Sequence, residues 1–406
     1  MTLLKSKITW LVVGLLLAGI GGAIFFIPSE KSSSVLEELR GLFPGGDAVR
    51  IPLVGDSPSR DGRQSGGFET EQGIIPSVRQ VSAVPVSGAT VFLRGGSQVI
   101  RYVERTTGNV FETGVDSLAT TRISNMTVPR IQESLWFGKG EGVLLRYLDG
   151  ETINTFSAKI ATSTEGGRLQ GSFLPDDIAE IAVNPAGTKI FYLQEAGSGS
   201  IGTLADPDGG RASALFSSPL REWLLSWGSE NKILFTTKPS AEIRGAAYTF
   251  DINTKSFVSV LGDVAALTAS ISPDGKTFFY SSAGDEIGAN LLSGGKTTES
   301  VLSTFADKCV WSGSQKLLCG TPFTLLAPSD LEAWYRGEIA LSDALWTLNT
   351  TLNIAELESA FGGFGDMDIT HPLLSPFGTH FLFINKNDLT LWSVEVEKAT
   401  ATPNTR

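Results

Sequence analysis

One short phrase recurs along the chain and limits what it can fold into. ISPDGKTFFYSS (271–282), VNPAGTKIFYLQ (183–194) and LSPFGTHFLFIN (373–384) each read as an apolar strand, a tight turn and a second apolar strand. Pro, Asp and Gly are residues that make tight turns, so each phrase predicts a β-hairpin. A unit that returns along a chain in this way indicates a repeat architecture.

Seven such units follow one another at about 48 residues each. The first apolar residue after each turn marks the repeat: Val91, Val143, Ile190, Ile233, Phe278, Leu317 and Phe381. Most units continue with a third and a fourth strand, which is typical of a β-propeller blade. Because a lone four-stranded sheet cannot bury both faces, the blades must pack in a ring. We therefore predict a mainly β, seven-bladed propeller, with six or eight blades as alternatives.

The repeats occupy residues 76–400 and leave a short polar tail at 401–406. A propeller ring closes when a strand from one terminus completes a blade begun at the other. The last unit holds three strands before the tail begins, so we expect its outer strand to come from residues 73–78.

Residues 8–27, ITWLVVGLLLAGIGGAIFFI, carry no charge. Twenty residues in a helix span the ~30 Å of a bilayer core. Lys5 and Lys7 precede this stretch, so the positive-inside rule places residues 1–7 in the cytoplasm and the rest of the chain outside. We expect an uncleaved signal-anchor helix. A cleaved signal peptide is the alternative, since Gly21-Gly22-Ala23 offers a small-x-small site.

Gly14, Ala18 and Gly22 are spaced four apart within this stretch. Small residues at this spacing let two membrane helices approach closely, so the stripe predicts weak homodimerisation. The alternative is that glycine is simply common in membrane spans.

Residues 28–75 change abruptly to a Gly/Ser/Pro-rich composition. Such a segment has too little apolar surface to fold, and we expect a flexible tether. SVLEELRGLF (34–43) is the one stretch in it that could form a short amphipathic helix.

The net charge is −11, from 32 basic and 43 acidic residues, and the basic residues form no cluster. Nucleic-acid binding needs a basic face, so we expect no nucleic-acid partner.

The turn phrases resemble those of the WD-repeat-like propellers that include the TolB-type periplasmic proteins, whose blades carry S-P-D-G-[KT]. Residues 272–276 match this motif fully, while 184–188 and 375–379 match in part. The resemblance covers about residues 78–400 and implies the fold. Because the family spans assembly factors, binding scaffolds and propellers fused to peptidases, it implies no single activity.

The longest gap, between Leu317 and Phe381, contains an insertion. Its Trp334, Tyr335 and Arg336 are followed by Trp346, and such side chains dominate interface hot spots. We take these four as interaction candidates. The alternative is that the aromatics cover the edge of their own blade. A W-Y-x-G element followed by D-x-[IL]-W looks like a pattern in uncharacterised bacterial membrane-anchored propeller proteins.

Cys309 and Cys319 are the only cysteines, and each lies five positions from Ser314. A hairpin that turns there places them opposite each other, within reach of a disulfide. An extracytoplasmic location permits oxidation. Two free thiols, or a hairpin slipped by one residue, are the alternatives.

Catalytic signatures are thin. The only histidines are His371 and His380, and blade geometry gives no reason for them to converge with Asp366 and Asp368. No G-x-S-x-G motif occurs, so a hydrolase nucleophile elbow is absent. We expect no catalytic residue, no metal and no cofactor.

The inner strands carry few polar residues apart from Glu133 and Glu180, which weighs against a charged channel. We therefore expect a bacterial, single-pass membrane protein whose extracytoplasmic propeller is an interaction module with a cell-envelope partner. A small-ligand receptor or enzyme with a site in the central channel is one alternative, and a structural spacer is another.

Overall fold

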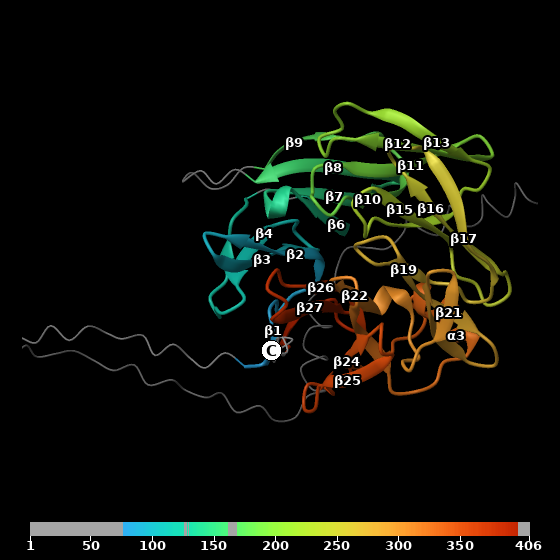
Figure 1. The fold of residues 1–406 in the computed structure, drawn as a ribbon. Coiled ribbons are helices and arrows are strands. Elements are labelled where there is room, and N and C mark those ends of the chain that lie inside the picture. The colour runs from blue at the N-terminus through green and yellow to red at the C-terminus, as the bar shows by residue number, and fades with distance from the viewer. Residues whose placement is uncertain (1–75, 126–127, 129, 161–168, 397–406) are drawn as a thin grey trace, which may run out of the picture. The chain divides into compact units, whose positions relative to one another are not determined.

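The computed structural model describes residues 76–125, 128, 130–160 and 169–396, within the compact unit Gln72–Arg406. These residues form seven four-stranded antiparallel sheets around a common axis (Figure 1). The predicted mainly β, seven-bladed propeller is therefore confirmed. The predicted membrane span, its small-residue stripe (Gly14, Ala18, Gly22), the tether and the polar tail lie outside the described residues.

The strands of six sheets follow chain order from the inner to the outer edge. Their bounds are β2 (Val86–Arg94), β3 (Ser97–Glu104), β4 (Val110–Gly114) and β5 (Thr121–Arg122); β6 (Ile131–Phe137), β7 (Gly142–Asp149), β8 (Thr152–Ile160) and β9 (Leu169–Phe173); β10 (Ile178–Val183), β11 (Ile190–Ala196), β12 (Gly199–Ala205) and β13 (Ser213–Ser218); β14 (Trp223–Ser226), β15 (Lys232–Thr237), β16 (Gly245–Asp251) and β17 (Ser256–Val264); β18 (Ala269–Ile271), β19 (Thr277–Ala283), β20 (Ile287–Ser293) and β21 (Lys296–Glu299); β22 (Cys309–Ser312), β23 (Lys316–Pro322), β24 (Asp343–Asn349) and β25 (Ile354–Ser359).

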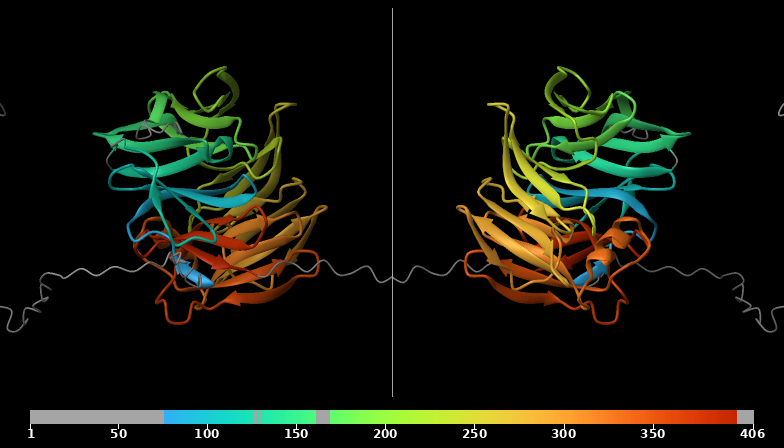
Figure 2. Two further views of the ribbon diagram at one scale, coloured as in Figure 1. Left: turned by 90° about the vertical axis from the view of Figure 1, so that its left-hand side faces the viewer. Right: turned by 90° about the vertical axis from the view of Figure 1, so that its right-hand side faces the viewer.

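The seventh sheet closes the ring. It contains β26 (Ile369–Leu374), β27 (His380–Asn385) and β28 (Leu391–Glu395), and its outer strand is β1 (Val78–Gln80) from the other end of the repeats. Val78 pairs with Val394 in antiparallel register, and the blue β1 lies among the red strands (Figures 1 and 2). The expected origin of this strand is confirmed, but it begins at Val78, the last residue of the predicted range.

Arg79 fastens this closing strand to the next blade. Its buried guanidinium donates to the backbone carbonyl of Gly114 at 2.8 Å and also to that of Ser117. Charged hydrogen bonds of this kind are among the stronger ones in proteins. The joint is therefore held by side-chain bonds as well as by strand pairing.

The recurring turn phrase has a common hydrogen-bonding pattern. Its first side chain accepts from two backbone amides across the turn: Ser272 from Lys276 and Thr277, Asn184 from Thr188 and Lys189, and Ser375 from Thr379 and His380. The glycine at the fourth position has a φ near +68°, which only glycine adopts without strain: Gly187 (68°), Gly275 (69°) and Gly378 (68°). The phrase recurs because each turn needs both a side-chain acceptor and a left-handed residue.

The first blade differs from the prediction. Val91 lies inside β2 and not at the start of a second strand, because the turn comes at Gly95-Gly96, both with positive φ. Gly88 is not a turn residue either. A Cβ atom at Gly88 would lie 2.1 Å from the carbonyl oxygen of Ser134 on the neighbouring inner strand. Gly88 therefore permits a close approach of two blades, which the sequence does not distinguish from a turn.

The core lies between neighbouring blades. One cluster joins Phe191 on β11 to Trp223 and Phe235 on the next sheet, and the Phe191 and Phe235 rings meet edge-on at 5.8 Å. Inner strands of adjacent sheets contact one another, including β2 with β6, β10 with β14 and β22 with β26. These contacts place the first strand of each sheet around the central channel.

Candidate functional site: the inserted helix and the channel entrance

The insertion between β23 and β24 forms the helix α3 (Pro328–Tyr335). Pro328 is at its first position, where proline is tolerated because the missing N–H would have no partner in the helix. The Asp330 carboxylate accepts from the backbone N–H of Ala327 at 2.8 Å. These two features start the helix at the point where the chain leaves the sheet.

Trp334 of α3 is buried against its own protein, with 6% of its surface exposed. Its indole N–H donates to the Asp368 carboxylate at 2.9 Å, and its ring meets Phe305 edge-on at 4.8 Å. The Lys386 ammonium lies over the indole ring, 3.7 Å from its centroid. Trp334 therefore packs inward and joins the insertion both to Phe305, before β22, and to Asp368, which directly precedes β26 of the last blade.

The other three interaction candidates differ from one another in exposure. Tyr335 is half-buried and donates its hydroxyl to Asp307 at 2.5 Å. Arg336 is exposed and pairs with Glu332 and Glu338, both at 2.8 Å. Trp346 is half-buried on β24 and packs beside the two cysteines. Arg336 is thus the most accessible of the four, and its charge is already paired.

A buried ion cluster lies under α3. The Lys308 ammonium contacts Asp343 at 2.6 Å and Asp368 at 2.5 Å, and all three side chains are fully buried. Asp343 also accepts from the Ile369 backbone, and Asp368 from the Leu341 backbone. The W-Y-x-G and D-x-[IL]-W elements therefore supply Trp334 and Asp343 to one cluster, which gives that sequence pattern a structural role.

Burial dominates the electrostatics of this cluster. It raises the pKa of Asp343 to about 6, against the opposing charge of Lys308, and lowers the pKa of Lys386 to about 8. One oxygen of Asp343, Oδ1, has no hydrogen-bond partner among the described residues. A buried charge is tolerated here only because Lys308 is present.

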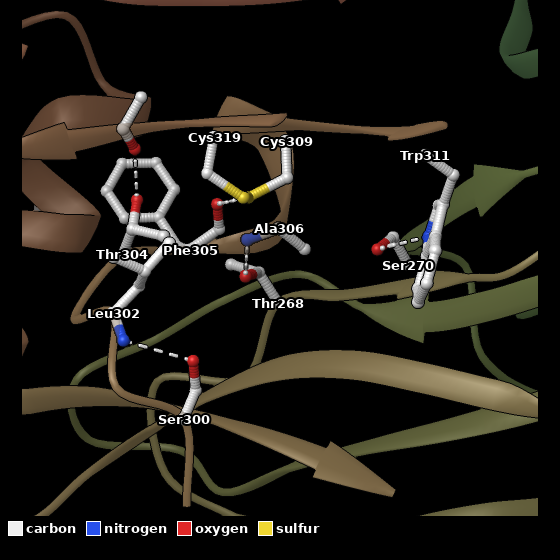
Figure 3. Close-up of a disulfide and its surroundings, with 11 residues drawn as sticks. Thr268, Ser270, Ser300, Leu302, Thr304, Phe305, Ala306, Cys309, Trp311 and Cys319 are labelled. Atoms are coloured by element: carbon white, nitrogen blue, oxygen red, sulfur yellow. Dashed lines mark hydrogen bonds between the residues drawn. A yellow bond between two sulfur atoms is a disulfide. The ribbon is translucent and has the colours of Figure 1, made fainter. Parts of the chain in front are cut away.

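Cys309 and Cys319 are joined by a disulfide. They are directly opposite each other on β22 and β23, and the two sulfur atoms lie 2.09 Å apart (Figure 3). The connection that leads into β22 is fixed next to them, because the Ala306 N–H donates to the Thr268 hydroxyl at 2.8 Å. The disulfide therefore lies at the start of β22, the inner strand of the blade that contains the insertion.

Reducing this disulfide is expected to lower the free energy of unfolding by about 2–3 kcal/mol, because the bond closes a short loop in the unfolded chain. Denaturant unfolding with and without reductant measures the change. The double variant Cys309→Ala/Cys319→Ala is the control, since its stability should not respond to reductant. Mass spectrometry that finds both thiols free in protein isolated under oxidising conditions would contradict the bond.

Three polar side chains lie at the third position of an inner strand: Glu133 on β6, Glu180 on β10 and His371 on β26. The pairing of each strand is interrupted at this point by a register shift. Such bulges re-aim side chains and are frequent next to functional sites. Because every blade is entered through the same type of connection, third residues lie at the same end of the channel. We call this end the channel entrance.

Two further polar groups reach the channel entrance from outside the inner strands. Asp307 belongs to η3 (Ala306–Lys308), directly before β22, and Tyr335 ends α3. Tyr335 lies near enough to Glu180 and Asp307, and His371 near enough to Glu133 and Asp307, for each carboxylate to shift their pKa values. Glu133 and Glu180 are the two polar inner-strand residues that the sequence indicates. His371, Asp307 and Tyr335 add to them, and the last two come from a connection and from the insertion.

The protein surroundings change the protonation of these groups. Burial raises the pKa of Glu180 to about 7, with a smaller contribution from Glu133. Burial also raises the pKa of Asp307, although the Tyr335 hydroxyl opposes this, and it lowers the pKa of His371. Yet His371 is exposed and Glu180 is only half-buried by surface area. Glu180 and His371 are therefore surrounded by protein but remain accessible to solvent, as expected for side chains that line an open channel.

The histidines do not come together with carboxylates as metal ligands. Across the described ranges, no group of three or more His, Cys, Asp or Glu side chains is placed to hold a metal ion. Asp368 belongs to the ion cluster, and His380 bonds to the Thr379 hydroxyl at 3.0 Å. The structure thus brings none of the four candidate ligands to one site.

Two hollows adjoin these features. The first is a groove of about 680 Å³ between the β18–β21 and β22–β25 sheets, which we call the side groove. The second is a pocket of about 660 Å³ at the channel entrance, which we call the entrance pocket; its lining includes Leu224, Lys238 and Tyr335. The sequence signalled neither hollow, because each is built from several connections.

Within the part of the chain that the structure describes, no helix is long and apolar enough to cross a membrane.

Comparisons with known proteins show the fold. No family model matches the chain, and no curated protein matches its sequence. Among solved structures, the tricorn protease has a TM-score of 0.52 at 11% identity over 80% of this chain, which spans about a third (34%) of that protease. The β-propeller domain of the Trilobed protease from Pyrococcus furiosus has a TM-score of 0.51 at 12% identity, covering 77% of this chain and 96% of that domain.

The second of these structures is described as having an open velcro topology. In the present chain β1 pairs with β28 and closes the ring. At this level of identity the likeness carries the architecture and no activity. The chain is a seven-bladed β-propeller that is similar in structure to part of the tricorn protease and to the β-propeller domain of the Trilobed protease.

Proposed function

We propose that the protein is a membrane-anchored, extracytoplasmic binding module that recognises an apolar segment of a cell-envelope protein and performs no catalysis. The observation that carries this proposal is the side groove with its exposed apolar rim. Phe323 and Leu325 are 62% and 65% exposed, and the exposed Val301 and Ile354 line the same groove. Contiguous exposed apolar surface is the usual mark of an interaction site.

The lining of the side groove favours an uncharged, extended partner segment. None of its fifteen lining residues carries a charge, in a chain whose net charge is −11. The neighbouring β25 is the outermost strand of its sheet and pairs on one side only among the described residues. An extended segment can add to such an edge through backbone hydrogen bonds while its side chains fill an adjacent groove.

The membrane anchor is part of the same proposal and is supported by the uncharged stretch at 8–27. An anchor raises the effective concentration of the propeller near other envelope proteins. The disulfide is compatible with an extracytoplasmic location, where oxidation is permitted.

Site-specific photo-crosslinking in intact cells tests this proposal. A crosslinker in place of Leu325 is expected to capture one stoichiometric envelope protein, and a crosslinker in place of Leu148 on β7, which is 53% exposed, is the control. Adding Phe323→Ser should weaken that capture by about tenfold, because exposed aromatics at a groove act as hot spots. Equal capture from both positions, or none from Leu325, would refute the side groove as the recognition surface.

A further inference from the structure

We propose that a polar pocket between the first and last blades binds a neutral saccharide. Its hydroxyl groups would bond to Gln98, Asp116 and Glu395, and its sugar ring would pack on Phe377. All four residues line this one pocket, which has a volume of about 570 Å³ and which we call the joint pocket. It shares no lining residue with the side groove, so this inference does not depend on the proposed protein-binding function.

Side-chain hydrogen bonds between the two blades build the wall of the joint pocket. Gln98 of β3 is only 8% exposed, and its amide Nε2 donates to the Thr379 hydroxyl at 3.1 Å. Its Oε1 accepts from the backbone N–H of Phe377 at 3.0 Å. The connection after β4 is held by the bonds of Arg79 to its carbonyls. Because both blades are tied together at the pocket, it is formed before a ligand arrives.

Two carboxylates of the joint pocket can accept hydrogen bonds from a ligand. Asp116 and Glu395 line the pocket, are exposed, and make no side-chain hydrogen bond or ion pair with any described residue. No lysine or arginine lines the pocket. Arg79 is buried and donates to the backbone carbonyl of Ser117, the residue after Asp116, so its charge is already engaged. An anionic ligand is therefore a poor match.

Hydrogen-bond donors line the same pocket. The Gln98 amide has a second N–H, and the hydroxyls of Ser97 and Ser117 can donate as well as accept. His380 contacts the Thr379 hydroxyl at 3.0 Å through Nδ1, which leaves its other ring nitrogen for a ligand. Burial lowers the pKa of His380, so its ring is uncharged at pH 7. Hydroxyl groups both donate and accept and so use all of these partners, whereas an ammonium or guanidinium group would use only the acceptors.

Phe377 gives the joint pocket an apolar wall. Its side chain is 55% exposed in the turn of the last blade. The same position of the 272–276 turn is Asp274, whose carboxylate accepts from the Lys276 backbone N–H at 3.2 Å. A phenyl ring cannot make that bond, so the turn itself does not explain Phe377. A pyranose ring has an apolar face of C–H groups that can pack on an aromatic ring while its hydroxyls bond to the polar walls.

An array of immobilised oligosaccharides, screened with the full-length protein, tests the inference. The disaccharide that is retained best is then titrated by calorimetry, and we expect Phe377→Ala and Glu395→Ala each to lose at least about tenfold in affinity. Phe173→Ala on β9 is the matched control and should change nothing, since Phe173 is 60% exposed and belongs to a different blade. Butylguanidinium, a cation without hydroxyl groups, should bind at least about tenfold more weakly than the disaccharide.

Hydrogen exchange gives an independent reading of where the ligand binds. A ligand in the joint pocket contacts both blades, so opening of the closing blade would release it. Disaccharide at about ten times its Kd should therefore slow exchange about tenfold in β28 and not in β14–β17. Equal slowing in β14–β17, or none in β28, would place the ligand elsewhere and overturn the inference.

Three further outcomes would overturn it: no retained oligosaccharide, an affinity that Phe377→Ala and Glu395→Ala leave unchanged, or butylguanidinium binding more tightly than the disaccharide. If Glu395→Ala does not fold, Asp116→Ala is measured in its place with the same expected loss. Failed crosslinking from Leu325 with intact saccharide binding would refute the side groove alone.

Discussion

Replacing Lys308 with alanine is expected to lower the free energy of unfolding by about 3–5 kcal/mol, because it leaves buried carboxylates without their cation. Asp343 and Asp368 are both fully buried and both contact the Lys308 ammonium. Lys386 does not replace it, because its ammonium donates to the backbone carbonyl of Trp334 and forms no ion pair with either aspartate. Denaturant unfolding of the full propeller measures the loss.

Two further variants separate charge from packing in the ion cluster. Lys308→Met keeps most of the side-chain volume and should be almost as destabilised as Lys308→Ala, since the unpaired carboxylates cause the loss. Lys276→Ala, at an exposed lysine in a turn, should change stability by less than about 0.5 kcal/mol. A near-native Lys308→Met variant would show that the carboxylates take up protons at little cost and that the ion pairs are not needed.

Replacing Trp334 with alanine is expected to cost about 3–5 kcal/mol and to free α3 from the propeller. The substitution removes a buried indole that packs on Phe305 and donates to Asp368. It also exposes Lys308 to solvent from the side that the indole covers, since the two lie 5.1 Å apart. Hydrogen exchange should therefore rise in Pro328–Tyr335 and not in β10–β13.

Trp334→Phe is the matched control for this prediction. It keeps an aromatic ring against Phe305 but loses the N–H, so we expect a loss of about 1.5–3 kcal/mol, the usual cost of one hydrogen bond to a charged group. Unchanged exchange in α3 after Trp334→Ala would mean that the helix is held by other contacts, and an equal loss for both variants would assign the whole effect to the hydrogen bond.

The fold could be predicted from the sequence because several blades repeat the same turn motif. The turn at Ser272 needs an acceptor at its first position and glycine at its fourth, and this requirement is visible within five residues. The cysteine pairing was predictable for the same reason, since a hairpin ten residues long determines which residues are opposite. Local geometry that depends on neighbouring residues can be read from a sequence.

Features that depend on distant residues could not be read in this way. Trp334 is of a residue type common in interfaces, and only its bond to Asp368, on a different blade, shows that it is internal. The turn expected before Val91 is absent because Gly88 there permits a close contact with Ser134 on the next blade, which the sequence does not show. The channel entrance was missed because Asp307 and Tyr335 lie in connections. An Asp-Lys pair directly before an inner strand was the one local signal for both the ion cluster and the entrance.

The pairing of Val78 with Val394 also determines when the ring can form during synthesis. The strand that completes the last blade is made first, and its partner is made more than three hundred residues later. Contacts between residues so far apart form slowly, and exposed strand edges are prone to wrong pairing until they form. Each of the other six sheets can assemble from a continuous segment as it emerges. The closing blade alone must wait for the end of the chain, with β1 left single until then.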